Sequence, residues 1–451
     1  MLLVSPSNHP TTKKNNMLRR SVIPLLVGTF ILRLNGGAGN IILGRFLAEL
    51  SLRHGRVITN INVGMLSVAF FVTELTLAPV MGAFSDRWGR RIFLTIGPVL
   101  GLIQVALLFF TPSENALLYL VSLQVLAGIS SAMQVPAVLG YLADYTAQNP
   151  ARRMRFMSFY ELATSGGLAA GVAAGGFAWD RFGRFSFGVL ALGYLLVALC
   201  MMVVPKVRQI MDRGRINALA MRYWRIIRTP RLFIFIPAWI SIAALLGVWL
   251  SSQLTFILSA RRHLPHQYLM GIVSGHGGGG RLSLILGAYV LFFGLCLLFW
   301  AFFLNRIPRL VLMLFSVAGV YLGCIALFGI NSGGVEQIPV LVFWIVVLML
   351  GIFAETAFAP AALAYLADVS EEAAKDRGLL MGLYSVFLGL GQLVGNGLGG
   401  VFAQVWGFNG LIYLTALLAF IALISLLFLF RQERRIAHST QHSVANFGPA
   451  E

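Results

Sequence analysis

The chain has 451 residues, of which 58% are hydrophobic and 11% are charged, and its formal net charge is +18. A soluble domain carries about 25% charged residues, so lipid must cover much of this surface. The basic residues lie in short segments between apolar runs, which is typical of membrane topology and argues against a nucleic-acid-binding protein.

Twelve apolar runs are each long enough to cross a bilayer, which takes about 20 residues in a helix. We expect the helices at 21–44, 61–84, 92–111, 116–143, 156–179, 185–204, 232–258, 282–304, 310–330, 338–366, 379–403 and 410–430. The sequence therefore predicts an all-α integral membrane protein, with twelve transmembrane helices in two pseudo-symmetric six-helix halves.

A basic break separates these halves. Segment 205–231 holds eight Lys or Arg against one acid, with apolar residues between the arginines. It is either an amphipathic helix on an anionic leaflet or a solvated linker. The predicted parts are a tail over 1–20, bundles over 21–204 and 232–430, the linker over 205–231 and a tail over 431–451. Basic residues gather on the side of both tails, which predicts a multi-pass protein of the plasma membrane with both termini in the cytoplasm.

The two halves also share an internal repeat at an offset of 224 residues. Segment 136–183 aligns without a gap to 360–407, with 15 identities in 48 positions. The segment Tyr141–Asp144 falls on Tyr365–Asp368, and glycine positions coincide as well. Parallel repeats of this kind place a solute site near the midplane of the membrane, at the interface between the halves.

The most specific local pattern lies in the short loop between the second and third predicted helices. Its defining residues are Gly82, Asp86, Arg87, Gly89, Arg90 and Arg91. Glycine permits a sharp turn, and an acid is suited to a neighbouring helix N-terminus. Together with the helix layout and the repeat, this pattern resembles the signature loop G-x-x-x-D-R-x-G-R-R of the major facilitator superfamily. The resemblance implies a secondary transporter that rocks its two halves around a midplane site.

The resemblance further implies a charge network on the inner side that gates transport. Its residues are Asp86, Arg90, Asp144 and Arg153 in the first half, and Asp368 and Arg377 in the second. Ordinary helix capping and solvation is the alternative. The corresponding loop of the second half departs from the family pattern, since Asn305 replaces the acid and Pro308 the glycine. This argues against a symmetric gate.

Two glycine-rich segments stand at equivalent positions of the repeat. The first resembles the superfamily's antiporter motif G-x-x-x-G-P-x-x-G-G, but Val172 replaces the proline and so removes its kink. Its twin carries Asn396 at that position. The motif favours an exporter, and generic packing of small residues is the alternative. The glycines concerned are Gly167, Gly171, Gly175, Gly176, Gly391, Gly395, Gly399 and Gly400.

Ionisable residues inside predicted membrane helices are costly and usually functional. Arg33 and Glu74 are expected at one depth, facing an aqueous cavity or pairing directly, with a buried structural pair as the alternative. Glu161 lies near an inner helix end, where a structural role is equally open. Glu355 has no evident basic partner in the membrane, so we expect it to carry the coupling proton, with Glu74 second.

Polar residues in apolar runs complete the candidate pathway. They are Asn35, Asn40, Gln134, Gln253 and Gln392, and each is either a solute contact or an interhelical hydrogen bond. Segment 261–280 holds three histidines and four consecutive glycines without nearby Cys, Asp or Glu, which predicts a flexible outer loop rather than a metal site.

The sequence has no Walker-type nucleotide loop and no hydrolase constellation, so we expect neither a cofactor nor enzymatic activity. The expected partners are a small organic solute, protons and the lipid bilayer, and the chain is expected to be a monomer. The leading hypothesis is proton-coupled efflux of an amphipathic or hydrophobic compound. The alternative is a symporter or facilitator that imports a sugar or organic acid, with Arg33 as an anion contact. A transport-like membrane sensor or scaffold is favoured least.

Overall fold

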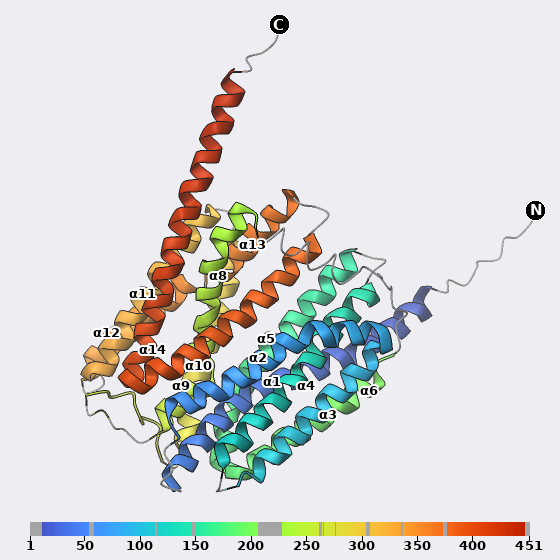
Figure 1. Cartoon of the computed structure of the whole chain (residues 1–451), viewed down its shortest axis with the longest axis vertical. Helices are drawn as coiled ribbons and strands as arrows, with labels where there is room; N and C mark the ends of the chain where they lie inside the picture. The colour runs from blue at the N-terminus through green and yellow to red at the C-terminus, as the bar shows by residue number, and fades with distance from the viewer. Residues whose placement is uncertain are drawn as a thin grey trace, which may run out of the picture. The chain divides into compact units, whose positions relative to one another are not determined.

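The computed structural model describes residues 11–53, 58–112, 115–146, 150–205, 228–260, 264, 266–275, 277–303, 307–334, 337–372 and 377–446. These residues form helices and connecting turns, and no strand occurs among them (Figure 1). The all-α class that the sequence predicted is therefore confirmed.

The chain packs as two compact units. The first comprises Met1–Gly39 and Thr73–Met211, and the second comprises Asn40–Val72 and Asp212–Glu451. Two helices, α1 (Thr11–Arg53) and α2 (Asn60–Trp88), contribute to both units. The rest of the first unit consists of α3 (Arg90–Phe109), α4 (Ala116–Thr146), α5 (Pro150–Phe182), η1 (Gly183–Phe185) and α6 (Ser186–Val203).

The second unit contains the part of α1 from Asn40 onward, the part of α2 up to Val72, and all later helices. These are α8 (Pro230–Trp249), α9 (Ser252–Ser259), α10 (Gly278–Phe303), α11 (Arg309–Gly329), η3 (Ile330–Gly334), α12 (Ile338–Glu355), α13 (Phe358–Glu372) and α14 (Arg377–Asn446).

Within the described ranges, ten stretches are long and apolar enough to cross a membrane. Two of them, Phe156–Val203 and Val386–Arg435, are 48 and 50 residues long, which is about twice the length of one crossing. Gly183 and Gly407 lie inside these stretches with φ of +52° and +60°, a conformation that glycine adopts without strain. Each of the two long stretches can therefore reverse its direction at this glycine and cross the membrane twice. The total of twelve crossings remains a prediction.

Two predicted helices are interrupted. The span expected over 338–366 ends as α12 at Glu355 and resumes as α13 at Phe358. Pro360 explains the break, because its ring clashes with the carbonyl four residues earlier, that of Thr356. The span expected over 232–258 is broken between α8 and α9, where the Asn40 side chain donates a hydrogen bond to the Leu250 carbonyl at 3.1 Å. The Asn40 side chain thus supplies a hydrogen-bond partner to a backbone carbonyl at the point where the helix is broken.

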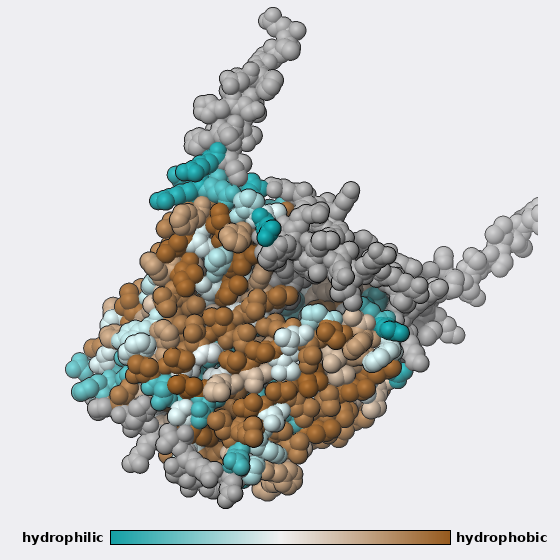
Figure 2. Space-filling model, in the orientation of Figure 1, coloured by the Kyte–Doolittle hydropathy of each residue, from teal (hydrophilic) through white to brown (hydrophobic). Residues whose placement is uncertain are grey.

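The face of the molecule that Figure 2 shows is apolar over much of its described area. Leu118 is 70% exposed and Phe302 is 81% exposed, and many other large apolar side chains are exposed with them. A surface of this kind is unfavourable in water but suits a lipid environment. Composition and exposure thus agree on a membrane-embedded protein.

Candidate functional site

Arg90 organises a charge network in the first unit. Gly89, with φ of +105°, makes the turn that separates α2 from α3, as the loop pattern predicted. Arg90 then pairs with Asp86 at 2.7 Å and with Asp144 of α4 at 2.5 Å. The Asp144 side chain is 9% exposed, whereas that of Asp86 is 58% exposed. One guanidinium therefore joins a buried and an exposed carboxylate from two helices.

Gly140 is a member of this site that the sequence analysis missed. A Cβ atom at this position would overlap the Arg90 guanidinium, so only glycine leaves room for the arginine on α4. The sequence could have identified Gly140, because it lies one helical turn before Asp144 and therefore on the same face of the helix. Gly82, by contrast, faces Pro136 at an ordinary contact distance of 3.5 Å. Arg87 is exposed.

The second unit contains a related pair. Arg309 opens α11, forms an ion pair with Asp368 of α13 and donates a hydrogen bond to the Ala364 carbonyl at 3.1 Å. Arg309 follows Pro308 as Arg90 follows Gly89, and Asp368 is the repeat equivalent of Asp144. The comparison of the two loops, in which Pro308 stands for Gly89, could have identified Arg309, which was not among the predicted site residues. The side chains of Arg153 and Arg377 lie outside the described residues, so their place in the network stays a prediction.

The charged residues inside the first unit gather around Arg33. The Arg33 guanidinium lies within electrostatic range of the Glu74 and Glu161 carboxylates. Glu74 accepts a hydrogen bond of 2.6 Å from the Ser131 hydroxyl, and Glu161 is exposed. Among the described residues, Arg33 forms no direct ion pair, and its Nε atom lacks a hydrogen-bond partner. The structure therefore brings Arg33 and Glu74 near one another without joining them.

Two polar candidates of the first unit are held by protein partners. The Asn35 amide donates to the Leu190 carbonyl of α6 at 3.0 Å, and Gly193 leaves room for it. Gln134 is 3% exposed and donates to the Ser130 carbonyl and hydroxyl within its own helix, while its Oε1 has no partner in the described part. Asn35 therefore joins α1 to α6, whereas Gln134 bonds one turn back along α4.

The glycine segments bring helices together in both units. A Cβ atom on Gly171 of α5 would meet the α1 backbone at Ala38 N, 2.8 Å away, and Gly167 approaches α1 in the same way. On α14, a Cβ atom on Gly391 would lie 2.5 Å from that of Ala243 on α8, and Gly395 also contacts α8. The two segments thus make equivalent packing contacts, α5 on α1 and α14 on α8. Gly399 meets its nearest neighbour at 3.8 Å, while Gly175 and Gly176 are buried.

A polar cluster anchors the ends of α1 and α2 inside the second unit. We call it the junction cluster, and its side chains are Asn40, Arg45, Asn60, Gln253 and Gln404. Asn60 accepts a hydrogen bond of 2.8 Å from the Gln253 amide, and its backbone N–H donates to Gln404 at 3.0 Å. Gln253 is 1% exposed, so here it is an interhelical hydrogen-bonding residue.

Arg45 is the charged member of the junction cluster. It is 8% exposed and donates to the carbonyls of Val273 and Gly275, at 2.6 and 3.0 Å. The backbones of α2 and α14 also pack closely near this cluster. A Cβ atom on Gly64 of α2 would lie 3.1 Å from the Gly400 Cα of α14. Buried hydrogen bonds and glycine contacts together hold the α1–α2 end to α8, α9 and α14.

The described part of the loop after α9 is folded, in contrast to the flexible loop that its composition predicted. The Gly271 and Val273 amides donate to the Ile257 and Leu258 carbonyls, both at 3.1 Å, and Val273 is buried. The Gln267 side chain is also buried and accepts a hydrogen bond from the Phe408 amide. Composition missed this packing because the loop is held by backbone and amide groups. Of its three histidines, only His266 lies within the described residues, where no metal-binding group of side chains occurs.

Glu355 is half-buried at the end of α12. Tyr289 of α10 and Cys324 of α11 lie within electrostatic range of its carboxylate. No Lys, Arg or His among the described residues forms an ion pair with it. Gln392 lies on α14 against Gly247 of α8, and its carbonyl accepts a hydrogen bond from Asn396. The candidate carboxyl groups of the two units thus have different surroundings.

The family of the chain follows from a match over nearly its whole length. The model of the Major Facilitator Superfamily matches residues 25–281 and 276–450. The chain therefore belongs to the major facilitator superfamily, and it is a multi-pass membrane transporter rather than an enzyme.

Curated relatives match parts of the chain. Multidrug resistance protein 1 of Bacillus subtilis (strain 168) is 32% identical over 143 residues, which cover 30% of this chain and 34% of that protein. Quinolone resistance protein NorA of Staphylococcus aureus is 23% identical over 192 residues, which cover 42% of this chain and 47% of that protein. The chain thus matches about a third to a half of the length of these relatives.

Solved structures with the same fold cover almost all of the chain. The nucleoside transporter NupG aligns with a TM-score of 0.69 at 13% identity, over 91% of this chain and 98% of that chain. A D-xylose-proton symporter aligns with a TM-score of 0.63 at 16% identity, over 91% of this chain and 97% of that chain. At these identities the likeness shows the fold alone.

Proposed function

We propose that this transporter exports a small amphipathic or hydrophobic organic compound by coupling its efflux to protons. The observation that carries the coupling is Glu355, a half-buried carboxyl on a candidate membrane span with no described basic partner. Such a group can change charge during a transport cycle, which proton coupling requires. The names of the partly matching resistance proteins and the two glycine segments support the outward direction.

In the proposed mechanism, bundles 21–204 and 232–430 rock around a midplane solute site. Segment 205–231 links them, both termini lie in the cytoplasm and the protein works as a monomer in the plasma membrane. Arg33 and Glu74 line the pathway in the first bundle, while Glu355 loads and releases the proton in the second. Parallel repeats support this arrangement, because they place solute sites at their interface.

The junction cluster serves as the seal of the outer side. Asn60 and Asp86 stand near the two ends of α2, 26 residues apart in the sequence. The hydrogen bonds of Asn60, Gln253 and Arg45 therefore act at the end of α2 opposite to the Arg90 network. Alternating access requires that these bonds break when the outer side opens, so the proposed resting state is closed outside.

Transport by the purified protein in vesicles tests this function. The chain is reconstituted with a pH-sensitive dye inside, and the flux of a lipophilic cation such as ethidium is followed with and without a proton gradient. Proton-driven movement of ethidium in the efflux direction supports the proposal. Gradient-driven accumulation of a sugar or organic acid would instead establish the importing alternative, for which Arg33 offers a cation that has no direct ion pair among the described residues.

A further inference from the structure

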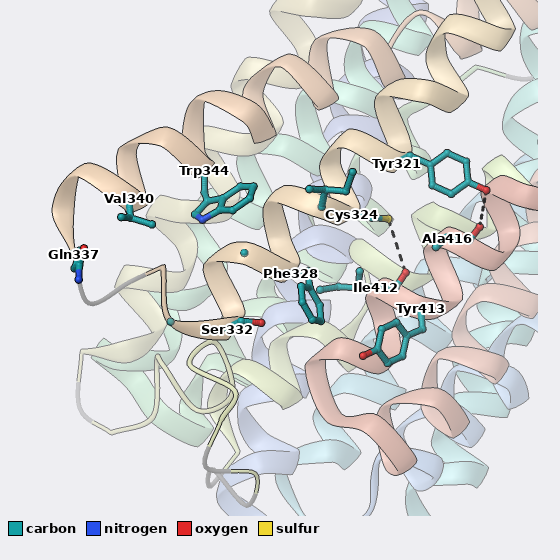
Figure 3. Close-up of a pocket in the computed structure, with 13 residues that line it drawn as sticks. Tyr321, Cys324, Phe328, Ser332, Gln337, Val340, Trp344, Ile412, Tyr413 and Ala416 are labelled. Atoms are coloured by element: carbon teal, nitrogen blue, oxygen red, sulfur yellow. Dashed lines mark hydrogen bonds between the residues drawn. The ribbon is translucent and has the colours of Figure 1, made fainter.

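A groove lies on the second unit between α11, η3, α12 and the part of α14 after Gly407 (Figure 3). Its volume is about 790 Å³, within the range of about 300–1,000 Å³ that is typical of ligand pockets. Most of its lining is apolar or aromatic, and the largest side chains are Tyr321, Phe328, Trp344 and Tyr413. The groove is separate from the junction cluster and from both charge pairs.

The sequence creates this groove by holding two antiparallel helices together at one level and apart at another. α11 and α12 touch where a Cβ atom on Gly351 would lie 2.7 Å from the Gly323 amide. Toward the other end of the pair, the Trp344 indole of α12 lies against Gly329, and a Cβ atom there would overlap the ring. Glycine contact and tryptophan spacing therefore splay the helices apart.

The polarity of the lining changes along the groove. At the level of Tyr321, polar atoms are already bonded, since the Tyr321 hydroxyl donates to the Ala416 carbonyl and the Cys324 thiol to the Ile412 carbonyl (Figure 3). At the other end, Ser332 and Gln337 are exposed, and their side chains bond to no protein group in the described part. The groove is thus apolar along its length and polar at one end.

The dimensions match one leaflet of a bilayer. From Tyr321 to Ser332 the helical rise is about 17 Å, and the hydrocarbon core of a bilayer is about 30 Å thick. Both walls belong to candidate membrane spans, so lipid is the surrounding solvent. We propose that the groove binds one acyl chain of a membrane phospholipid, with the glycerol ester region at Ser332 and Gln337.

The lining argues for this occupant over other molecules. None of the described residues that line the groove is charged, so we expect the acyl chain and ester region, rather than a particular headgroup, to determine binding. A phosphatidylcholine and a phosphatidylglycerol of equal chain length should therefore occupy it equally well. The groove lies wholly within the second unit, whereas the proposed solute site lies between the two bundles.

Trp344 provides a direct probe of this site. The full-length protein is reconstituted with dioleoyl phosphatidylcholine brominated on its acyl chains, which quenches tryptophan fluorescence on contact, and is then mixed with excess unbrominated vesicles. Subtracting the signal of Trp344→Phe isolates the recovery of Trp344. Trp406→Phe isolates that of Trp406, which is 45% exposed on α14 outside the groove. We expect Trp344 to recover about tenfold more slowly, because a bound chain must first dissociate.

Three results would overturn the proposal. Equal recovery of both tryptophans would mean ordinary boundary lipid, and no quenching at Trp344 would mean that a second copy of the chain covers the groove. Relief of the Trp344 quenching by a transported dye would assign the groove to the solute. Ala416→Phe should fill the groove and abolish the slow phase, whereas Leu417→Phe on the adjacent exposed position should leave it unchanged. The tryptophan comparison decides the question even if Ala416→Phe does not fold.

Discussion

Two arginine–aspartate ion pairs, whose aspartates are equivalent in the repeat, show how the halves of this transporter differ. Arg90 and Asp144 in the first unit have side chains 16% and 9% exposed, and Asp86 joins them. Arg309 and Asp368 in the second unit are 35% and 52% exposed, and Asn305 stands where a third charge would be. The arginine–aspartate pair is thus largely buried in the first unit and more exposed in the second.

The glutamates inside the candidate membrane spans also differ between the units, in the partners that their carboxyl groups have. Glu74 of the first unit accepts a hydrogen bond from Ser131 and lies within range of Arg33. Glu355 of the second unit has neither kind of partner among the described residues. We infer a division of labour in which the first half holds its charges fixed and the second half carries the one that changes.

Replacing Glu355 tests this division with the largest expected effect. Glu355→Gln should abolish proton-driven flux, because the amide cannot carry a proton through the cycle, and should leave solute exchange without a gradient largely intact. Parallel flux and exchange assays in vesicles measure both. Glu74→Gln is the matched control and should retain part of the driven flux. A Glu355→Gln protein that still concentrates solute with a proton gradient would refute the assignment.

The two ion pairs should differ in stability. Asp144→Asn removes one partner of a largely buried pair, a change that costs about 3–5 kcal/mol when burial is complete. We expect a loss of about 3 kcal/mol for Asp144→Asn, whereas Asp368→Asn should cost about 0–1 kcal/mol because its pair is solvent-screened. Unfolding of the purified variants in detergent measures the difference. Equal losses would show that burial does not distinguish the two halves.

Gly140 sharpens the comparison, because its repeat equivalent is Ala364. Gly140→Ala should cost about 1–3 kcal/mol, since the added methyl group displaces the Arg90 guanidinium. Gly166→Ala on α5 is the control, because its Cβ would meet only Phe30 at 3.7 Å. In an Arg90→Ala background the cost of Gly140→Ala should vanish, which a double-mutant cycle measures. A cost that persists there would point to backbone strain instead.

Asp86 carries the smallest expected effect. We predict that Asp86 approaches the N-terminus of the helix beginning at Arg377 when the inner side closes, where a carboxylate contributes about 0.3–1 kcal/mol. Asp86→Asn should therefore shift the population about two- to fivefold toward the inward-open state. Spin-label distances report the populations, and Asp86→Glu should behave as the parent. Unchanged populations in Asp86→Asn would remove this residue from the gate.

The sequence predicted the fold well because its signals are local and strong. Apolar runs and the 224-residue repeat identify the helices and the equivalent acids Asp144 and Asp368. The reach of α1 and α2 into the second unit was not predictable, because it depends on long-range contacts such as Asn60 with Gln253. Composition likewise failed for the loop after α9, where Gln267 and backbone amides impose order. Neutral polar residues resemble one another in sequence, and only packing separates a helix contact from a solute contact.

The junction cluster has a consequence for how the protein is made. Asn40, Arg45 and Asn60 are synthesised early, yet their partners Gln253, Val273 and Gln404 leave the ribosome roughly 190 to 340 residues later. Until then, these polar groups of the first hairpin lack the long-range hydrogen bonds that they make in the folded protein. The first hairpin therefore completes its packing only after most of the chain has been made, and we expect an amino-terminal half expressed alone to be degraded faster than the intact chain.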